Sequence, residues 1–272
     1  MAIGVKTNVS SLMAQRHLNS TNRSLAGNIA KLSSGFRINS AADDAAGLAV
    51  SEEMKAGIRS LGQASRNAND AISVIQTAEG SLGEMHNILG RMRELSVQAN
   101  SDGINNDQRA HLHTEFDQLR TELTEIAERT EFNGNTLLDG TAEFSFQVGV
   151  NGTDTVTIEI DDAFDADGLN LDTHDLSTTA GAVAAMADID AAITSVSGER
   201  ASLGAMQNRL ESKLDNLEVS RQNLEAANSR IRDVDIASEM ADMTKNQILM
   251  QAGTSMLAQA NSLPQTALSL LG

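Results

Sequence analysis

The sequence of 272 residues contains no Cys, Trp or Tyr, six Phe and a single Pro. Large cores gain much of their burial from aromatic side chains, so this composition favours thin layers of helix packed on helix, and the lack of Cys excludes disulfides, thiolate metal sites and cysteine nucleophiles. The net charge of −17 argues against nucleic acid as a partner.

The first expected element is an amphipathic helix over residues 5–37. Leu18, Leu25 and Leu32 repeat in it at intervals of seven residues, which is the spacing of a coiled-coil stripe. The chain has no run of about eighteen apolar residues and no apolar region of a signal peptide at its N-terminus, so we expect no membrane span. Secretion by another route stays open.

A second helix is expected from about Asp44 to Asn100. Ser40-Ala-Ala-Asp43 matches the capping-box pattern with Asp in the Glu position, which predicts where this helix begins. After the turn at residues 101–103, apolar residues at steps of four and three predict a third helix that ends at residues 132–134. Its apolar positions are Leu112, Phe116, Leu119, Leu123 and Ile126.

The hydrophobic period then changes to two, which predicts strands. The alternating residues are Phe144, Phe146, Val148 and Val150 in the first strand and Val156, Ile158 and Ile160 in the second. Asn151-Gly152 between them favours the positive φ angles of a tight turn, so we predict a β-hairpin near 143–161. An acidic loop follows, since residues 140–199 hold twelve Asp or Glu and no Lys or Arg. This charge indicates a solvated, self-repelling surface.

Helix is expected again from about Ala182 to Asp233, followed by a last helical segment to Gly272. Two more heptad registers run through these segments. They are Leu203, Leu210, Leu217, Leu224 and Ile231 in the first, and Leu249, Met256, Leu263 and Leu270 in the second. Because a helix cannot bury such a stripe by itself, we expect the two ends of the chain to pair.

The predicted fold is therefore mainly α, with long antiparallel helices. Residues 1–42 and 233–272 are expected to form a terminal coiled-coil domain. Residues 43–232 are expected to form a middle helical-bundle domain that carries the small β-hairpin and the acidic surface loop, with no further outer domain.

No catalytic, cofactor-binding or metal-binding residue is predicted. His111 and His113 lie two residues apart and point to different faces of a helix, which is poor chelating geometry. Asp165-Ala-Asp167-Gly168 matches part of a calcium loop, but the first and twelfth ligand positions would then be Ala and His. The sequence also lacks a nucleotide fingerprint, a phosphate loop and a nucleophile elbow, so we expect no enzyme.

Three longer motifs are distinctive. They are Asn39-Ser-Ala-Ala-Asp-Asp-Ala-Ala-Gly-Leu48, Ser229-Arg-Ile-Arg-Asp-Val-Asp-Ile-Ala-Ser-Glu-Met240, and Gln251-Ala-Gly-Thr-Ser-Met-Leu-Ala-Gln-Ala-Asn261 followed by Pro264-Gln265 and Leu268-Ser-Leu-Leu271. In this order they resemble the terminal signatures of bacterial flagellins, over about residues 1–140 and 200–272. The resemblance implies termini that pair as a coiled coil inside a filament, a surrounding layer of middle helices, and ends that are disordered in the free monomer.

The resemblance also implies function and partners. The protein is expected to be a structural subunit that polymerises helically into the flagellar filament, the propeller for swimming, after export in the unfolded state and assembly at the tip. Expected partners are its own copies, hook–filament junction proteins, the filament cap, an export chaperone and the type III export apparatus, with no cofactor and an extracellular location. The heptad registers predict the filament-assembly residues Leu18, Leu25, Leu32, Leu249, Met256 and Leu263.

Many flagellins are ligands of an innate immune receptor of the toll-like class. By resemblance, the contact lies on the stretch Arg91-Met-Arg-Glu-Leu95-Ser-Val-Gln98, with Glu115 as the matching acid on the next helix. Residues 91, 95 and 98 follow at steps of four and three, so they are expected to share one helix face. The alternative is that this face packs against neighbouring subunits in the filament.

Other interpretations stay open at this point. A hook–filament junction protein would share the terminal pattern, although the full tail motif argues against it. A secreted coiled-coil adhesin or effector would belong to a different class, and electron microscopy after seeding would separate it from a protein that extends filaments. A flagellin with a metalloprotease insertion would need a His-Glu-x-x-His motif, which the sequence lacks.

Overall fold

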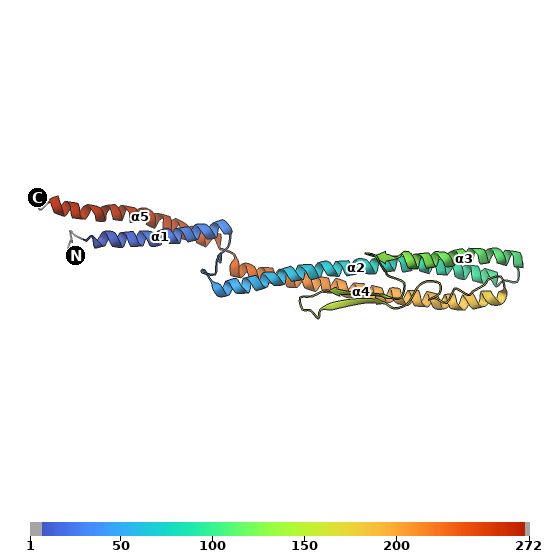
Figure 1. The fold of residues 1–272 in the computed structure, drawn as a ribbon. Coiled ribbons are helices and arrows are strands. Elements are labelled where there is room, and N and C mark those ends of the chain that lie inside the picture. The colour runs from blue at the N-terminus through green and yellow to red at the C-terminus, as the bar shows by residue number, and fades with distance from the viewer. Residues whose placement is uncertain (1–6, 270–272) are drawn as a thin grey trace. The chain divides into compact units, whose positions relative to one another are not determined.

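The computed structural model describes residues 7–269, and side chains as far as residue 262. Helices dominate this part of the chain (Figure 1). They are α1 (Val9–Ser34), α2 (Ala45–Ala99), α3 (Asn106–Arg129), α4 (Thr179–Arg232) and α5 (Ile236–Ser269). The predicted mainly α fold with a small antiparallel hairpin is confirmed.

The chain forms two compact units, residues up to 58 together with those from 222 onward, and residues 59–221. The boundaries predicted at residues 42 and 233 lie in the two breaks between helices, and the two units divide elsewhere, within α2 and α4. The first turns of α2 and the last turns of α4 belong to the same unit as α1 and α5. Both α2 and α4 continue through the point where the units divide.

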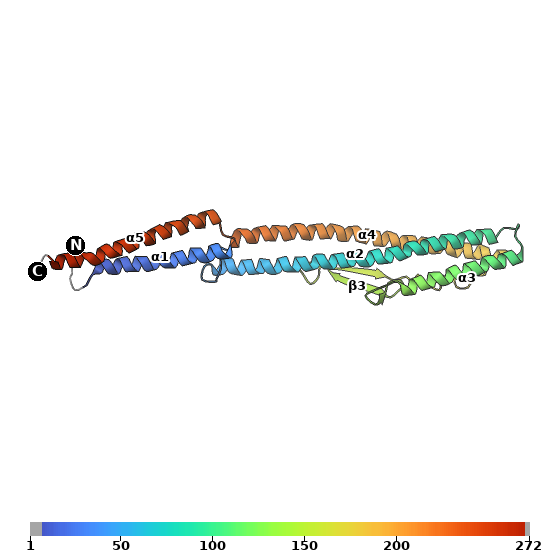
Figure 2. The same cartoon turned by 90° about the horizontal axis from the view of Figure 1, so that it is seen from above.

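In the unit 59–221, α2 and α4 lie side by side, with α3 beside them (Figures 1 and 2). The buried face of α2 holds mostly Ala from Ala64 to Ala78 and larger residues from Leu82 to Leu95. Both kinds of residue belong to one core, to which α3 contributes Phe116 and α4 contributes Ile189 and Leu203. The predicted heptad in α4 is buried at Leu203, Leu210 and Leu217.

The third helix ends earlier than expected, at Arg129. A two-residue hairpin follows it, in which β1 (Glu131–Phe132) pairs with β2 (Asn135–Thr136). Asn133 and Gly134 form its turn with φ angles of 52° and 80°. Both central residues of a type I′ turn need positive φ, and Asn-Gly adopts this geometry at low cost. The Asn-Gly pair therefore closes a hairpin and does not end a helix.

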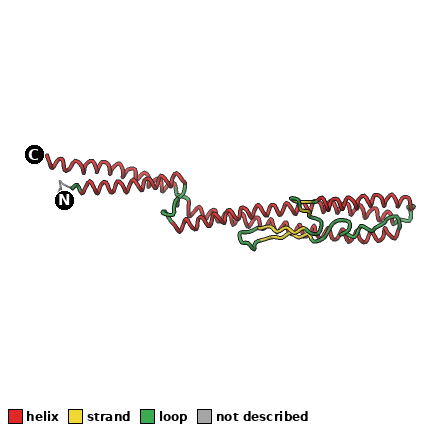
Figure 3. The backbone as a smooth tube through the Cα atoms, viewed as in Figure 1, coloured by secondary structure: helices red, strands yellow, loops and turns green. Residues whose placement is uncertain are grey.

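The larger hairpin pairs β3 (Ala142–Gln147) with β4 (Thr155–Ile160), and Phe144 faces Ile158 across it. Figure 3 shows these two strands, in yellow, running side by side along the long helices. The expected strand through Val150 is wrong at its end, because β3 stops at Gln147. The Asp154 carboxylate instead accepts hydrogen bonds from the backbone and the side chain of Asn151, which shape a longer loop.

The acidic loop of residues 161–178 is packed and not merely solvated. Its carboxylates at positions 161, 162 and 167 are exposed, but several of its apolar residues enter the core. These are Phe164, Leu169, Leu171 and Leu176. Arg120 of α3 donates to the Asp172 carbonyl at 2.6 Å, and His174 lies 2.7 Å from Asp188 of α4. The loop is thus bonded to both α3 and α4.

The predicted capping box lies one turn before its expected place. Asp43 accepts hydrogen bonds from the backbone of Asn39 and Ser40, and this closes a turn before the helix. These bonds lower the pKa of Asp43. Asp44 is the residue that caps α2, since its carboxylate accepts from the Gly47 N–H at 2.9 Å. The sequence motif is therefore a turn followed by a cap.

By length and composition alone, α4 is the one helix in the described part of the chain that could cross a membrane. A helix that buries one face in a protein core has the same composition. Ala182, Ile189 and Val196 of its apolar stretch lie in the core of the unit 59–221, which accounts for its apolar character.

Candidate functional site

The terminal helices α1 and α5 form an antiparallel pair (Figures 1 and 2). The residues that each helix turns toward the other are shielded from solvent and recur at steps of three and four. In α1 they are Ser11, Ala14, Leu18, Thr21, Leu25, Asn28 and Leu32, and in α5 they are Glu239, Met243, Asn246, Met250, Gly253, Leu257 and Ala260. This is the a/d pattern of a coiled coil, and we call these two sets the seam.

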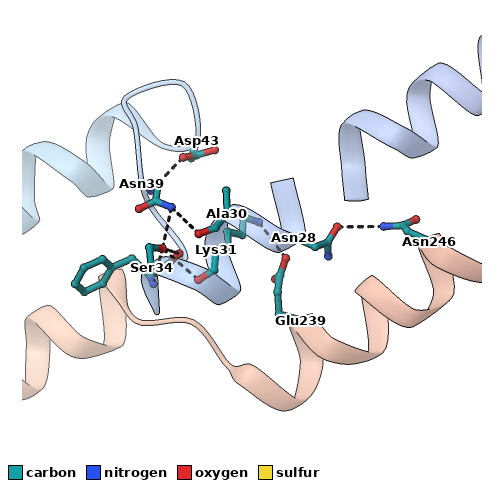
Figure 4. A network of polar contacts seen from close by, with 9 residues as sticks. Asn28, Ala30, Lys31, Ser34, Asn39, Asp43, Glu239 and Asn246 are labelled. Atoms are coloured by element: carbon teal, nitrogen blue, oxygen red, sulfur yellow. Dashed lines mark hydrogen bonds and ion pairs between the residues drawn. The ribbon is translucent and has the colours of Figure 1, made fainter. Parts of the chain in front are cut away.

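Polar side chains bond across this seam in one register. Asn246 donates to the Asn28 side-chain oxygen at 3.1 Å, and Lys31 lies 3.9 Å from Glu239 (Figure 4). At the other end, Asn8 caps α1 and donates to the Ala260 carbonyl at 2.7 Å. Each bond joins one residue of α1 to one of α5, so a shift by a heptad would break them all.

Between these polar contacts, the backbones of α1 and α5 come close together. A Cβ atom at Gly253 would stand 3.1 Å from Cγ of Leu18. Leu18 therefore fills the space that the missing side chain leaves, and a larger residue at position 253 would push the helices apart.

The predicted assembly residues divide into two groups. Leu18, Leu25 and Leu32 lie in the seam. Leu249 and Met256 do not face them: they are 48 % and 65 % exposed, and the side chain of Leu263 lies outside the described residues. The expected packing of the α1 register against Leu249 and Met256 is therefore wrong.

The error has a physical reason. Each of these exposed residues directly precedes a seam residue, Met250 or Leu257, and one residue along a helix turns the side chain by about 100°. The seam also uses Asn246, Gly253 and Ala260, which repeat at seven residues but include no large apolar side chain. A search for leucine-type heptads misses such a register, and the matching Asn28 in α1 was the signal that could have identified it.

Exposed apolar side chains concentrate on the terminal pair. Among the side chains that the structure describes, nine of the fourteen exposed large hydrophobic residues belong to α1 or α5. They are Val9, Leu12, Met13 and Ile29 in α1, and Ile236, Met240, Ile248, Leu249 and Met256 in α5. So many uncovered apolar residues on one helix pair indicate a surface that another chain covers.

The predicted receptor residues lie in the other unit, on α2 and α3. Arg91 pairs with Glu115 at 2.8 Å and with Glu94 at 2.9 Å, and these partners raise the pKa of Arg91. Leu95 is only 1 % exposed and packs in the core. The expectation that Leu95 shares an outer face with Arg91 and Gln98 is wrong, because position 95 continues the buried stripe of α2 from Leu89 and Met92.

No reactive constellation accompanies these surfaces. The pocket between α2 and α3, of about 480 Å³, is open and lined mainly by glutamates and Arg129. Within residues 7–269 no group of three His, Asp or Glu could hold a metal ion. The arrangement supplies helix surfaces for packing, which is typical of a structural helical protein.

Comparison with known proteins gives the family. The model of the bacterial flagellin N-terminal helical region matches residues 5–143, and that of the bacterial flagellin C-terminal helical region matches residues 186–271. The chain belongs to the bacterial flagellin family. It is a structural subunit of the flagellar filament, which is extracellular, and it is not an enzyme.

Relatives match along nearly the whole chain. Flagellin of Bacillus subtilis (strain 168) is 46 % identical, over 98 % of this chain and 99 % of that protein. Flagellin FlaB2 of Treponema pallidum (strain Nichols) is 44 % identical over the same shares. The crystal structure of Bacillus cereus flagellin is 36 % identical with a TM-score of 0.51, and the match covers 56 % of this chain and 88 % of that one.

The interpretation as a hook–filament junction protein is not favoured by these comparisons. A Vibrio parahaemolyticus structure described as a flagellar hook-associated protein reaches a TM-score of 0.61 over 70 % of this chain, but at 14 % identity. A likeness at that identity concerns the fold alone. The two matched family regions leave residues 144–185 between them, which hold most of the β3–β4 hairpin and the packed acidic loop.

Proposed function

We propose that this filament subunit is exported unfolded through a flagellar type III apparatus, added at the tip beneath a cap, and used in a polymer that turns as the propeller for swimming. The composition supports rapid refolding after export. With no Cys and a single Pro, neither disulfide exchange nor a series of slow X-Pro isomerisations delays the chain.

The observation that carries this proposal is the uncovered apolar surface of α1 and α5. Polar or small residues such as Thr21, Asn28 and Gly253 interrupt the apolar residues of the two-helix seam. The seam therefore buries little apolar area, and isolated terminal helices have little stability of their own. Neighbouring copies that cover residues such as Leu249 and Met256 supply the missing burial. Polymerisation then completes the folding of the ends.

Truncation tests this proposal. Deleting residues 1–32 or 250–272 removes one partner of the seam but leaves the core of the unit 59–221 intact. Both truncated proteins are expected to stay soluble and helical by circular dichroism and to remain in the supernatant after seeding, whereas the full chain sediments as filaments. Normal filaments from either truncation would refute the role of the terminal helices.

The exposed face of α5 also supports an export chaperone as a partner. An amphipathic helix with Ile248, Leu249 and Met256 uncovered is the kind of ligand that an apolar groove binds. Replacing Leu249 and Met256 together by Ser is expected to weaken chaperone binding in calorimetry, whereas the same change at the exposed Val219 of α4 leaves it unaltered. Equal affinities for the three proteins would refute this partner. Hook–filament junction proteins would meet the same terminal helices at the base of the filament.

A second proposed function is recognition by a toll-like innate immune receptor. Its support is the exposed Arg91–Glu115 pair that joins α2 and α3, because a partly exposed Arg is a frequent anchor of protein interfaces. Arg91→Ala and Gln98→Ala are expected to lower the signal of monomeric protein in reporter cells, and Lys213→Ala on α4 serves as the control. A silent wild type, or variants as active as the wild type, would contradict this function.

A further inference from the structure

A polar pocket opens on one flank of the α1–α5 seam. It has a volume of about 360 Å³ and is bordered by three carboxylates, Asp43, Glu239 and Asp242, and by the ammonium group of Lys31. Figure 4 shows Asp43, Glu239 and the Asn28–Asn246 pair around this region. The pocket therefore has more acidic than basic groups on its wall.

Two of these carboxylates, those of Glu239 and Asp242, retain room for another donor, whereas Asp43 already accepts bonds from the backbone of Asn39 and Ser40. Lys31 lies at 3.9 Å from Glu239, and Lys245, outside the pocket, lies at 3.9 Å from Asp242. Both distances are long for charge-assisted hydrogen bonds, which are usually below about 3 Å. A planar guanidinium can offer several N–H donors to such a group of oxygens.

One wall residue of the pocket, Asp242, begins a row that includes exposed apolar residues of α5. Asp242, Leu249 and Met256 follow one another at seven-residue steps, and each directly precedes a seam residue. They therefore lie in one row along the same flank, which we call the α5 ridge. Asp235 precedes them by a further seven residues. The ridge is acidic toward the start of α5 and apolar toward its end.

A row of complementary character lies on the back of α1. Val9, Arg16 and Arg23 also follow at seven-residue steps, and all three are exposed. Arg16 lies midway between the seam residues Ala14 and Leu18, so its side chain starts about 200° from each and points away from α5. Among the side chains that the structure describes, residues 7–262, no hydrogen bond or ion pair engages Arg16. This row, the α1 ridge, is apolar at its start and basic after it.

We propose that the α1 ridge of a second copy docks on the α5 ridge, with Arg16 of that copy in the pocket at Asp242 and Glu239. The two seven-residue rows then match throughout: Val9 meets Leu249 when Arg16 meets Asp242, and Arg23 falls beside Asp235. The incoming helix runs antiparallel to α5, as the chain's own α1 does. All copies therefore point the same way.

Such a contact joins two different surfaces, so it is heterologous and leaves a free ridge of each kind at the ends. Copies added in this way form an open helical array. The inference rests on the proposed polymerisation and adds to it the residues that select the register between copies.

Exchanging the charges of Arg16 and Asp242 tests whether these two residues pair between copies. Arg16→Glu and Asp242→Arg are each expected to raise the critical concentration of seeded polymerisation about tenfold, as for loss of a close ion pair between proteins. The double variant Arg16→Glu with Asp242→Arg is expected to return it to near the wild-type value. Lys213→Glu on α4 gives the same change in net charge as Arg16→Glu and serves as the control for that variant. Circular dichroism checks that every variant keeps its helix content.

The outcomes separate the two ideas. A wild type that forms no filaments defeats the proposed polymerisation and the docking together. A wild type that polymerises, with single variants that behave like the control, overturns only the docking. Single variants that fail without rescue in the double variant also overturn it, because the two charges then act at separate places.

Discussion

At the scale of single residues, the Asn28–Asn246 pair is the most informative contact of the terminal helices. Asn28 is 8 % exposed, and its side-chain oxygen accepts from Asn246 across the seam. A buried polar pair in a coiled coil lowers stability relative to Leu but favours the one register in which both partners bond. The Asn28–Asn246 pair thus favours the correct register of the two helices and lowers the stability of their pairing.

Replacing both Asn28 and Asn246 by Leu tests this reading. The seam then offers apolar layers in more than one register, so helix content of the free monomer is expected to rise while the yield of sedimenting filaments falls. The single variant Asn246→Ala serves as a contrast, since it leaves Asn28 without its partner and should destabilise the pair by about 1–3 kcal/mol. Unchanged helicity and filament yield in the double variant would contradict a register role.

Glu199 on α4 is a residue whose ionisation opposes folding. Burial, followed by the nearby Asp162 and Asp161, raises its pKa in the folded state. A raised pKa on an acid means that the folded state binds a proton more tightly than the unfolded state, so the ionised group costs stability above that pKa. Glu199→Gln is therefore expected to raise the unfolding midpoint at pH 7.

The same linkage predicts how the effect depends on pH. As the pH falls from the raised folded-state pKa of Glu199 to its ordinary value, the advantage of Gln shrinks, and below the ordinary pKa it disappears because both states are protonated. Thermal unfolding followed from pH 7 down to pH 4 measures this convergence. An advantage of Glu199→Gln that stays constant over this range would show that packing, and not charge, causes it.

At the scale of elements, periodic segments could be predicted from the sequence and aperiodic ones could not. The heptad through Leu203, Leu210 and Leu217 predicted the buried face of α4, because regular spacing and large apolar residues coincide there. The α5 seam was missed because its register mixes Asn, Gly and Met. The β1–β2 hairpin was missed because two-residue strands leave no alternation to detect.

The composition of the acidic loop led to a wrong prediction of how far the loop is exposed to solvent. Its many carboxylates suggested a solvated segment, but Phe164, Leu171 and Leu176 enter the core at irregular spacing. Leu171→Ala is expected to destabilise the unit 59–221 by about 2–5 kcal/mol, because it leaves a cavity in a packed core. Denaturant unfolding measures this, with the exposed Asp167→Ala as the control. Equal midpoints for the two variants would mean that the loop contributes no packing.

At the scale of the whole molecule, eight of the seventeen excess negative charges lie in residues 144–185, between the two family-matched regions, where there is no Lys or Arg. Identical copies packed in a filament repeat this charge at close range. Ionic screening weakens such repulsion once the Debye length falls to about 10 Å, near 0.1 M salt. Moderate salt is therefore expected to speed polymerisation of monomers, and mild acid, which neutralises carboxylates, is expected to do the same.

The carboxylates of residues 161–167 allow this to be tested without altering the terminal helices. Changing Asp161, Asp162, Asp165 and Asp167 together to Asn removes four negative charges. We expect this variant to polymerise faster than the wild type at low salt and at a similar rate at 0.3 M, about where the Debye length shortens to roughly 6 Å. Light scattering over a salt series measures both rates, and changing four glutamates of the unit 59–221 to Gln provides a charge-matched control. If the salt response of the Asn variant equals that of the wild type, the acidic loop does not set the repulsion between subunits.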